Sequence, residues 1–293
     1  FNFVSQGDNI LKDTNSLRSR MINNLDIQSY GYFSEIGFKN NLNYYLKNTI
    51  SAGKNNTEYD SSPHVKFMNI IELVSSFPLI SISDKYSNFL DPKISLRFNP
   101  SDMKSYKNEN RQISNDNLFN INRLGLIDTL ESGNNLTLGL DFKRENIDNI
   151  NKYFEFKLGK VLRTKTNSNL PTNSTLDKKN SNYFGKVTNT LHDNINLNYE
   201  FSINHDLDEI QYSSLSTTIK KNNFVTTFNY IEEAGEVGSA NILENVTTFN
   251  FNDQNFITFK TRENKEINLT EYYDLIYEYK NDCLIAGIKY NKT

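Results

Sequence analysis

The sequence lacks tryptophan, has one cysteine among 293 residues, and contains no long apolar run. The longest apolar run of note, Cys283 to Ile288, is far shorter than the ~20 residues that a membrane-spanning helix needs. Any membrane-spanning part must therefore consist of strands. A lone thiol excludes an internal disulfide. The net charge of -3 and the scattered lysines and arginines argue against a nucleic-acid or acidic-lipid partner.

Proline is also scarce, and residues 172–293 contain none. This absence favours uninterrupted strand ladders, because proline cannot donate a hydrogen bond to them. Only 37% of the residues are hydrophobic, yet aromatic residues reach 13% through 20 Phe and 17 Tyr. Aromatic side chains among abundant asparagines fit a β architecture with a polar interior better than a compact soluble globule. An AT-rich genome also enriches proteins in asparagine, so the asparagine content alone does not distinguish these two architectures.

The clearest pattern lies in residues 194–204, where polar residues at even positions alternate with apolar residues at odd positions. A strict period of two predicts a strand with one apolar and one polar face. We expect a polar loop around Gly7 and Asp8, and a β-bulge at Ser213 and Ser214, where the alternation slips by one residue. The predicted strands cover residues 16–28, 36–50, 64–76, 88–99, 134–145, 152–163, 182–191, 194–204, 209–220, 223–232, 240–252, 255–263, 267–279 and 283 to the end.

The connections between these strands alternate in length. Segments 51–63, 100–133 and 164–181 are long, and tight turns such as 192–193 and 253–254 lie between the later strands. An up-and-down sheet with long loops at one end and tight turns at the other is typical of an outer-membrane β-barrel, whose long loops are extracellular. We therefore predict an all-β, transmembrane, antiparallel up-and-down β-barrel. Residues 1–293 would form a single barrel domain, about 15 strands of a larger barrel, because both chain ends fall inside alternating sequence.

In such a barrel the apolar face of each strand touches lipid and the polar face lines a wet lumen. A soluble β-sandwich or solenoid also alternates, but its apolar faces must pair with each other. The predicted lipid-facing residues are Leu136, Leu138, Leu140, Leu197, Tyr199 and Phe201. The predicted lumen-facing residues are Thr137, Asp141, Lys143, Asn196, Asn198 and Glu200.

A group of charged residues and glycines precedes the strand at 134–145. Arg123, Asp128 and Glu131 could form a network that holds the long loop inside the lumen, where opposite charges attract more strongly than at a surface. The alternative is that they are solvated loop charges, each contributing little. Gly125 and Gly133 suit positions with positive φ or tight packing.

Residues 120–143 resemble a segment of the lipopolysaccharide-assembly proteins of the LptD family, also called organic-solvent-tolerance proteins. The family usually has Arg after the Asp that corresponds to Asp128, whereas this chain has Thr129, so an ion pair built on that Arg has no counterpart here. Residues 15–20, 77–79 and 279–290 resemble successive parts of the same barrel. The matching residues in the central motif are Arg123, Gly125, Asp128, Glu131, Gly133, Leu136, Gly139 and Leu140.

The resemblance implies a translocon that inserts lipopolysaccharide into the outer leaflet of the bacterial outer membrane. Its implied partners are lipopolysaccharide, outer-membrane lipid, a plug lipoprotein of the LptE type, and a periplasmic bridge protein of the LptA type reached through a domain N-terminal to this chain. Family members carry a disulfide at the place of Cys283, which implies a partner cysteine outside this chain.

No motif in the sequence supports catalysis, a metal site or a cofactor. The three histidines lack metal-ligand spacing, and neither a Gly-x-Ser-x-Gly motif nor a phosphate-binding loop is present. The chain is therefore not expected to be an enzyme. The sequence also allows two other kinds of protein. One is a different outer-membrane barrel, such as a porin or a receptor for small solutes, and the other is a soluble β-repeat adhesin.

Overall fold

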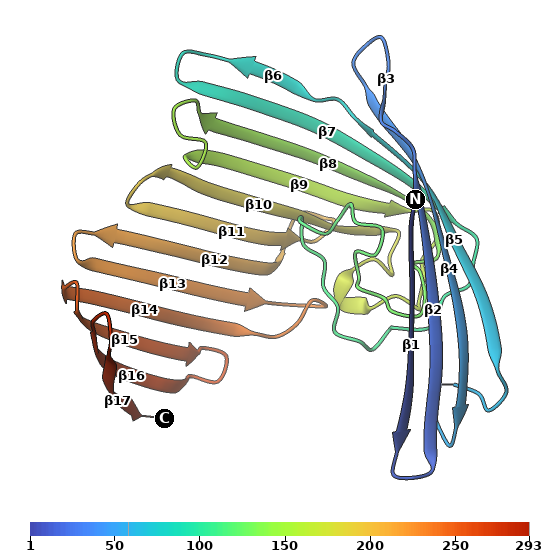
Figure 1. The fold of residues 1–293 in the computed structure, drawn as a ribbon. Coiled ribbons are helices and arrows are strands. Elements are labelled where there is room, and N and C mark those ends of the chain that lie inside the picture. The colour runs from blue at the N-terminus through green and yellow to red at the C-terminus, as the bar shows by residue number, and fades with distance from the viewer. Residues whose placement is uncertain (58, 293) are drawn as a thin grey trace. The chain divides into compact units, whose positions relative to one another are not determined.

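A computed structural model describes residues 1–57 and 59–292, and almost all of its regular structure is β-strand (Figure 1). Residue 58, inside the predicted loop 51–63, and residue 293, at the end of the last predicted strand, lie outside the described residues. The strands are β1 Asn2–Lys12, β2 Ser16–Gln28, β3 Tyr32–Phe33, β4 Lys39–Lys54, β5 His64–Ser76, β6 Leu79–Ile82, β7 Tyr86–Asn99, β8 Gly133–Asn146, β9 Tyr153–Arg163, β10 Asn180–His192, β11 Ile195–Ile203, β12 Ile210–Lys221, β13 Phe224–Glu233, β14 Asn241–Asn252, β15 Asn255–Asn264, β16 Leu269–Lys280 and β17 Ile285–Lys292.

The 17 strands form an antiparallel up-and-down sheet, which confirms the predicted fold class of an incomplete β-barrel. Two short strands continue longer ones. β3 extends β2 along β4, and β6 extends β5 along β7 after an interruption at Phe77 and Pro78. The 17 elements therefore make 15 passes, which agrees with the prediction of about 15 strands; β1 is the pass that the predicted ranges do not include.

The chain divides into two compact units. Unit 1 comprises residues 1–78, 91–139 and 160–181, and unit 2 comprises residues 79–90, 140–159 and 182–293. Unit 1 contains the hairpins of β1, β2, β4 and β5 and the two long loops that follow β7 and β9. Unit 2 contains the consecutive hairpins from β10 to β17, joined by short turns.

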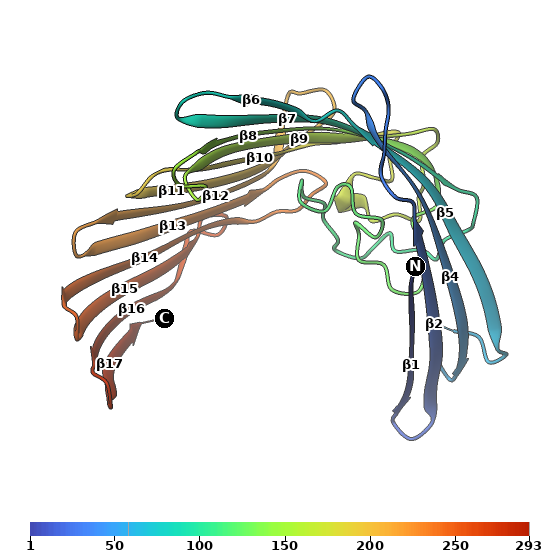
Figure 2. The ribbon, with the colours of Figure 1, turned by 45° about the horizontal axis from the view of Figure 1, so that its top comes forward.

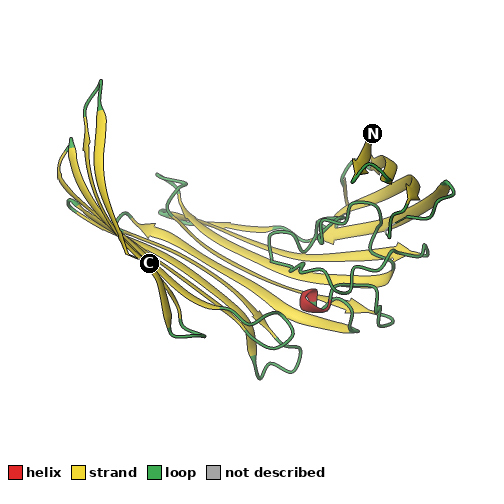
Figure 3. Ribbon diagram, turned by 90° about the horizontal axis from the view of Figure 1, so that it is seen from below, coloured by secondary structure: helices red, strands yellow, loops and turns green. Residues whose placement is uncertain are grey.

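The covered face of the sheet in unit 1 is mostly polar, with a small apolar cluster. Tyr45, Met68 and Ile70 of β4 and β5 pack against Leu130 and Ile121 of the loop that joins β7 to β8. The opposite face of the same strands is exposed and apolar, with Phe67 64% accessible. Figure 2 shows the loop, in green, beside β2, β4 and β5, and Figure 3 shows the 3₁₀ turn η1, Thr172–Ser174, in the loop that follows β9.

In unit 2 a glycine fits an aromatic ring on the neighbouring strand. Gly185 of β10 lies directly opposite Phe201 of β11, and a Cβ atom at Gly185 would lie 2.0 Å from Phe201 Cζ. Phe201 also stacks on Tyr199, with the ring centroids 5.5 Å apart. The absence of a side chain at Gly185 therefore lets the Phe201 ring cover the neighbouring strand.

Several predicted boundaries were wrong. The polar loop expected around Gly7 and Asp8 lies inside β1, where Asp8 pairs with Arg20 across the ladder and Arg20 donates a 3.0 Å hydrogen bond to its carboxylate. The predicted loops 51–63, 100–133 and 164–181 are shorter, because β4 continues to Lys54, β8 begins at Gly133 and β10 begins at Asn180. In each case cross-strand pairing keeps polar residues in the ladder.

The predicted β-bulge at Ser213 and Ser214 was also wrong. The register between β11 and β12 shifts at Gln211 instead, because Ser202 pairs with Tyr212 and Ile203 pairs with Ile210. Gln211 is buried, and its side-chain carbonyl accepts a 2.8 Å hydrogen bond from Asn182.

Candidate functional site

Glu131, just before β8, is a buried carboxylate at the end of the long loop. Arg123 binds it through two hydrogen bonds, Nε to Oε2 at 2.7 Å and Nη2 to Oε1 at 2.6 Å. Arg163, at the end of β9, donates to the same carboxylate, and Asn135 donates at 3.2 Å. Arg123 also donates to Thr137 Oγ1 at 3.0 Å. One carboxylate thus joins the loop to the ends of β8 and β9.

Asp128, the second acid of the motif, forms a separate anchor. It accepts hydrogen bonds from Tyr59 at 2.6 Å, from Tyr106 at 2.5 Å and from Lys104 at 3.0 Å. The backbone carbonyl of its neighbour Ile127 accepts a 2.7 Å bond from Lys47 of β4. The predicted network is therefore two anchors: Arg123 pairs with Glu131, and Asp128 binds other partners.

The two acids remain ionised because their partners outweigh the effect of burial. Burial alone would raise the pKa of Glu131, but the charges of Arg123, Arg163 and Arg97 lower that pKa to about 2. Burial would likewise raise the pKa of Asp128, but hydrogen bonds from Tyr106, Tyr59 and Lys104 lower it to about 2. Both carboxylates are therefore fixed negative charges at neutral pH.

A third ion pair, which was not predicted from the sequence, lies on the covered face of β5 and β7. Glu72 pairs directly with Arg97 in the strand register, and Arg97 Nε lies 2.7 Å from Glu72 Oε1. Arg97 also donates to the backbone carbonyl of Phe119 in the loop at 2.8 Å. Opposite charges at polar positions of neighbouring strands are the sequence signal for this pair, but the signal becomes useful only once the register is known.

The two glycines of the motif allow the backbone turns that the anchors require. Gly125 has φ of +62° and Gly133 has φ of +87°. The Gly125 carbonyl accepts a 2.7 Å bond from Arg111. A Cβ atom at Gly133 would lie 3.0 Å from Arg163 Nη2, next to the Glu131 anchor.

The predicted lumen-facing residues of β8 and β11 differ in how far they are buried. Thr137 is fully buried under the loop, whereas Lys143 is partly exposed, pairs with Glu145 and lies over the Tyr153 ring. Asp141 is partly buried.

On β11, Glu200 pairs with Lys186 at 3.0 Å and Asn198 accepts a hydrogen bond from Thr188 at 3.1 Å. Asn196 is exposed. Which of these residues face a lumen stays a prediction.

The predicted lipid-facing residues lie on the other face of the same strands, because side chains alternate along a strand. Leu138 is exposed, and Leu136 and Leu140 are partly exposed. Their contact with lipid also stays a prediction. In unit 2, Leu197, Tyr199 and Phe201 are partly exposed on the face opposite Asn198 and Glu200.

Cys283 lies in the turn between β16 and β17, and its thiol is exposed. Its backbone N–H donates a 3.0 Å bond to Asn281 Oδ1. Asn281 thus closes the turn. Cys283 is the single cysteine of the sequence, so its thiol has no disulfide partner within this chain.

Within residues 1–57 and 59–292, no group of three or more His, Cys, Asp or Glu side chains could hold a metal ion. No helix in the same residues is long and apolar enough to span a bilayer.

The arrangement is that of two-faced strands with a long loop held by buried ion pairs on the polar face. The family model LptD, described as LPS transport system D, matches residues 27–262. The chain belongs to the LptD family. No curated protein matches it. The predicted family is confirmed, and the matched range includes the loop motif of Arg123 to Gly133.

Membership in the LptD family assigns the chain a role in lipopolysaccharide transport and assembly at the outer membrane. LptD-family proteins are transport and assembly proteins rather than known enzymes. They bind lipopolysaccharide and work with other components of the same transport system.

Proposed function

We propose that this chain forms the barrel wall of a translocon in the outer membrane, inserting lipopolysaccharide into the outer leaflet. The sugar portion passes along the polar face of the strands, and the acyl chains leave through a lateral seam. The observation that carries this proposal is the pairing of a polar, hydrogen-bonding face with an exposed apolar face in a chain of the LptD family.

The polar face of unit 2 has a chemistry that suits a sugar chain. Short hydroxyl and amide side chains lie opposite each other on neighbouring strands. Ser216 donates to Asn229 at 2.7 Å, and Thr248 and Thr258 are 3.0 Å apart. Such neutral groups exchange hydrogen bonds with sugar hydroxyls without the large desolvation cost of a charge.

The long loops 55–63, 100–132 and 164–179 would lie on the extracellular side and the tight turns on the periplasmic side. A plug lipoprotein of the LptE type would occupy the lumen. A bridge protein of the LptA type would deliver lipopolysaccharide through a domain N-terminal to this chain. Cys283, in a tight turn, would form its disulfide in the oxidising periplasm.

Site-specific photocrosslinking in cells tests the passage of lipopolysaccharide along the polar face. A photoreactive residue at Asn198 of the full-length protein should give lipopolysaccharide adducts. The same residue at Leu197, one position away on the apolar face, should give only background. Equal adducts at both positions, or none at Asn198, would contradict the proposal and favour a porin or receptor.

A non-reducing gel of the full-length protein tests the role of Cys283. Cys283→Ser should change the mobility of the oxidised protein, because a covalent loop to the periplasmic domain is lost. Unchanged mobility would remove the disulfide from the proposal.

A further inference from the structure

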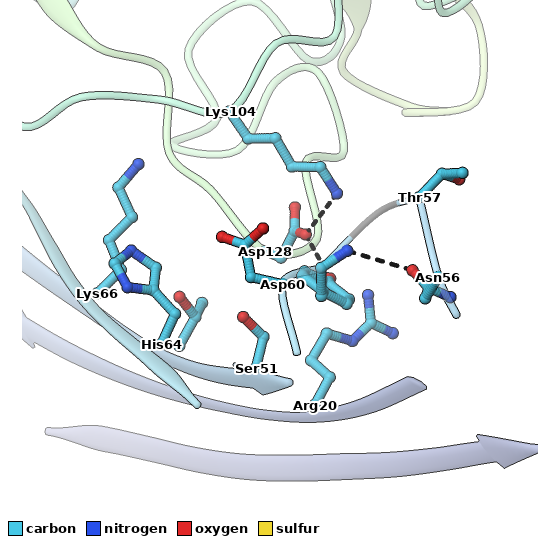
Figure 4. A pocket seen from close by; sticks show the side chains of 11 residues that line it. Arg20, Ser51, Asn56, Thr57, Asp60, His64, Lys66, Lys104 and Asp128 are labelled. Carbon is cyan, nitrogen blue, oxygen red and sulfur yellow. Dashed lines mark hydrogen bonds and ion pairs between the residues drawn. The ribbon is translucent and has the colours of Figure 1, made fainter. Parts of the chain in front are cut away.

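A cavity of about 330 Å³ lies in unit 1 at the end where the long loops leave the sheet (Figure 4). Its walls come from β2, β4 and β5, from residues 56, 57, 59 and 60 in the loop after β4, and from residues 104 and 128 in the loop after β7. The volume is at the lower end of the ~300–1,000 Å³ typical of small-molecule sites. The cavity therefore suits one small ligand rather than a long chain.

Three cationic side chains line this cavity, but two of them are already paired. Lys104 binds Asp128 at 3.0 Å, and Arg20 binds Asp8 at 2.5 Å. Lys66 of β5 has no ion pair among residues 1–57 and 59–292. An acidic ligand group can therefore be bound by Lys66 without breaking an existing ion pair.

Four other lining groups can exchange hydrogen bonds with ligand hydroxyls. Ser51 and Thr57 carry hydroxyl groups, Asn56 an amide and Asp60 a carboxylate. Figure 4 shows their side chains around the same space as those of the cations. Carboxylates and amides accept hydrogen bonds from ligand hydroxyls. The Asp60 carboxylate would repel a small free anion, but it would bind the hydroxyls of a ligand whose acid group lies at the opposite wall.

We propose that this cavity binds one acidic sugar residue, with its phosphate or carboxylate at Lys66 and its hydroxyls at Asp60 and Asn56. The inference rests on the proposed function, since the ligand would be a sugar unit of the transported lipopolysaccharide. The site would hold the sugar portion at the long-loop end of the sheet.

Titration calorimetry on the full-length protein in detergent tests the site with four probes: glucose 6-phosphate, galacturonic acid, glucose and inorganic phosphate. We expect the two acidic sugars to bind at least about tenfold more tightly than glucose or phosphate. Comparable affinity for inorganic phosphate would mean a simple anion site and would overturn the inference. Absence of saturable binding by either acidic sugar would also overturn it.

The matched pair of variants is Lys66→Gln and Lys107→Gln. Lys107 is exposed in the loop that carries Lys104, and it does not line the cavity. We expect about tenfold weaker acidic-sugar binding for Lys66→Gln and a change within about twofold for Lys107→Gln. Equal losses for the two variants would overturn the assignment.

Asp60→Asn provides a second variant that keeps the volume of the cavity. It should weaken acidic-sugar binding by about tenfold while strengthening phosphate binding, because a repelling charge is removed. Equal strengthening for sugar and phosphate would overturn the role of Asp60. If acidic sugars fail to bind while Asn198 still crosslinks to lipopolysaccharide, the sugar site fails and the proposed function stands.

Discussion

Replacement of Glu131 by Gln tests whether buried ion pairs hold the long loop of this LptD-family chain in place. The carboxylate is 4% exposed and lies against Arg123 and Arg163, whose side chains are 0% and 2% exposed. Glutamine keeps the shape and one acceptor oxygen, but it removes the negative charge that both buried guanidinium groups bind.

Two arguments give a similar magnitude for the stability that Glu131→Gln loses. Breaking a buried ion pair by removing one partner costs about 3–5 kcal/mol, because an uncompensated charge remains. The pKa of Glu131 falls from an ordinary 4.5 to about 2, which corresponds to about 3 kcal/mol in favour of the ionised folded form. We therefore expect the free energy of unfolding to fall by about 3 kcal/mol or more.

The control is Glu109→Gln in the same loop. Glu109 lies 2.7 Å from Arg111, but its side chain is 50% exposed, so its pair contributes only about 0–1 kcal/mol. Both variants of the full-length protein should be unfolded with denaturant in detergent, and loop 100–132 should be probed with protease in the folded state. Glu131→Gln should lower stability and expose the loop to cleavage. If the two variants lost the same stability, or the loop stayed protected in both, the buried anchor would be refuted.

Three further predictions follow from the strands and from the second anchor. Leu197→Lys should lower the unfolding free energy by about 2 kcal/mol in a lipid bilayer, and Asn198→Lys should change it by less than about 1 kcal/mol; equal losses would mean that the strand is covered on both faces. Gly185→Val should lower the free energy of unfolding by about 1–3 kcal/mol, because the valine side chain would overpack against Phe201. Phe201→Ala should relieve that loss in the double variant. Thermal unfolding measures both effects. The folded-state pKa of Asp128 is lowered from 3.8 to about 2, so its stabilisation is present above about pH 4 and is lost as the pH falls toward 2. Hydrogen exchange in loop 100–132 should rise more over that pH range in the wild type than in Asp128→Asn, because the Glu131 anchor titrates over the same range in both proteins.

Alternation in the sequence predicted the long strands well. The predicted ranges 16–28 and 64–76 agree residue for residue with β2 and β5. It failed in β1, where Gly7 and Asp8 indicate a turn but pair with Met21 and Arg20 in the ladder. A polar residue can lie in a strand when its partner strand supplies an opposite charge, and the sequence does not show which strand that is.

The loop motif was predictable in part. The positions of Arg123 and Glu131 allowed an ion pair, but solvated loop charges were the alternative until their burial was known. Arg163 lies 32 residues from Glu131 along the chain, and it reaches that carboxylate because β9 ends next to the start of β8. No local pattern marks such a partner.

The sequence by itself determined the β architecture, 14 of the 15 passes and the two faces of each of these strands, because a period of two is a local property of the chain. It also carried the similarity to the LptD family, whose model matches residues 27–262. Only the tertiary structure decided which charges are paired, where the bulge lies, and that residues of the loops after β4 and β7 line a cavity with Lys66. Those features depend on strand register and loop packing, which bring together residues far apart in the sequence.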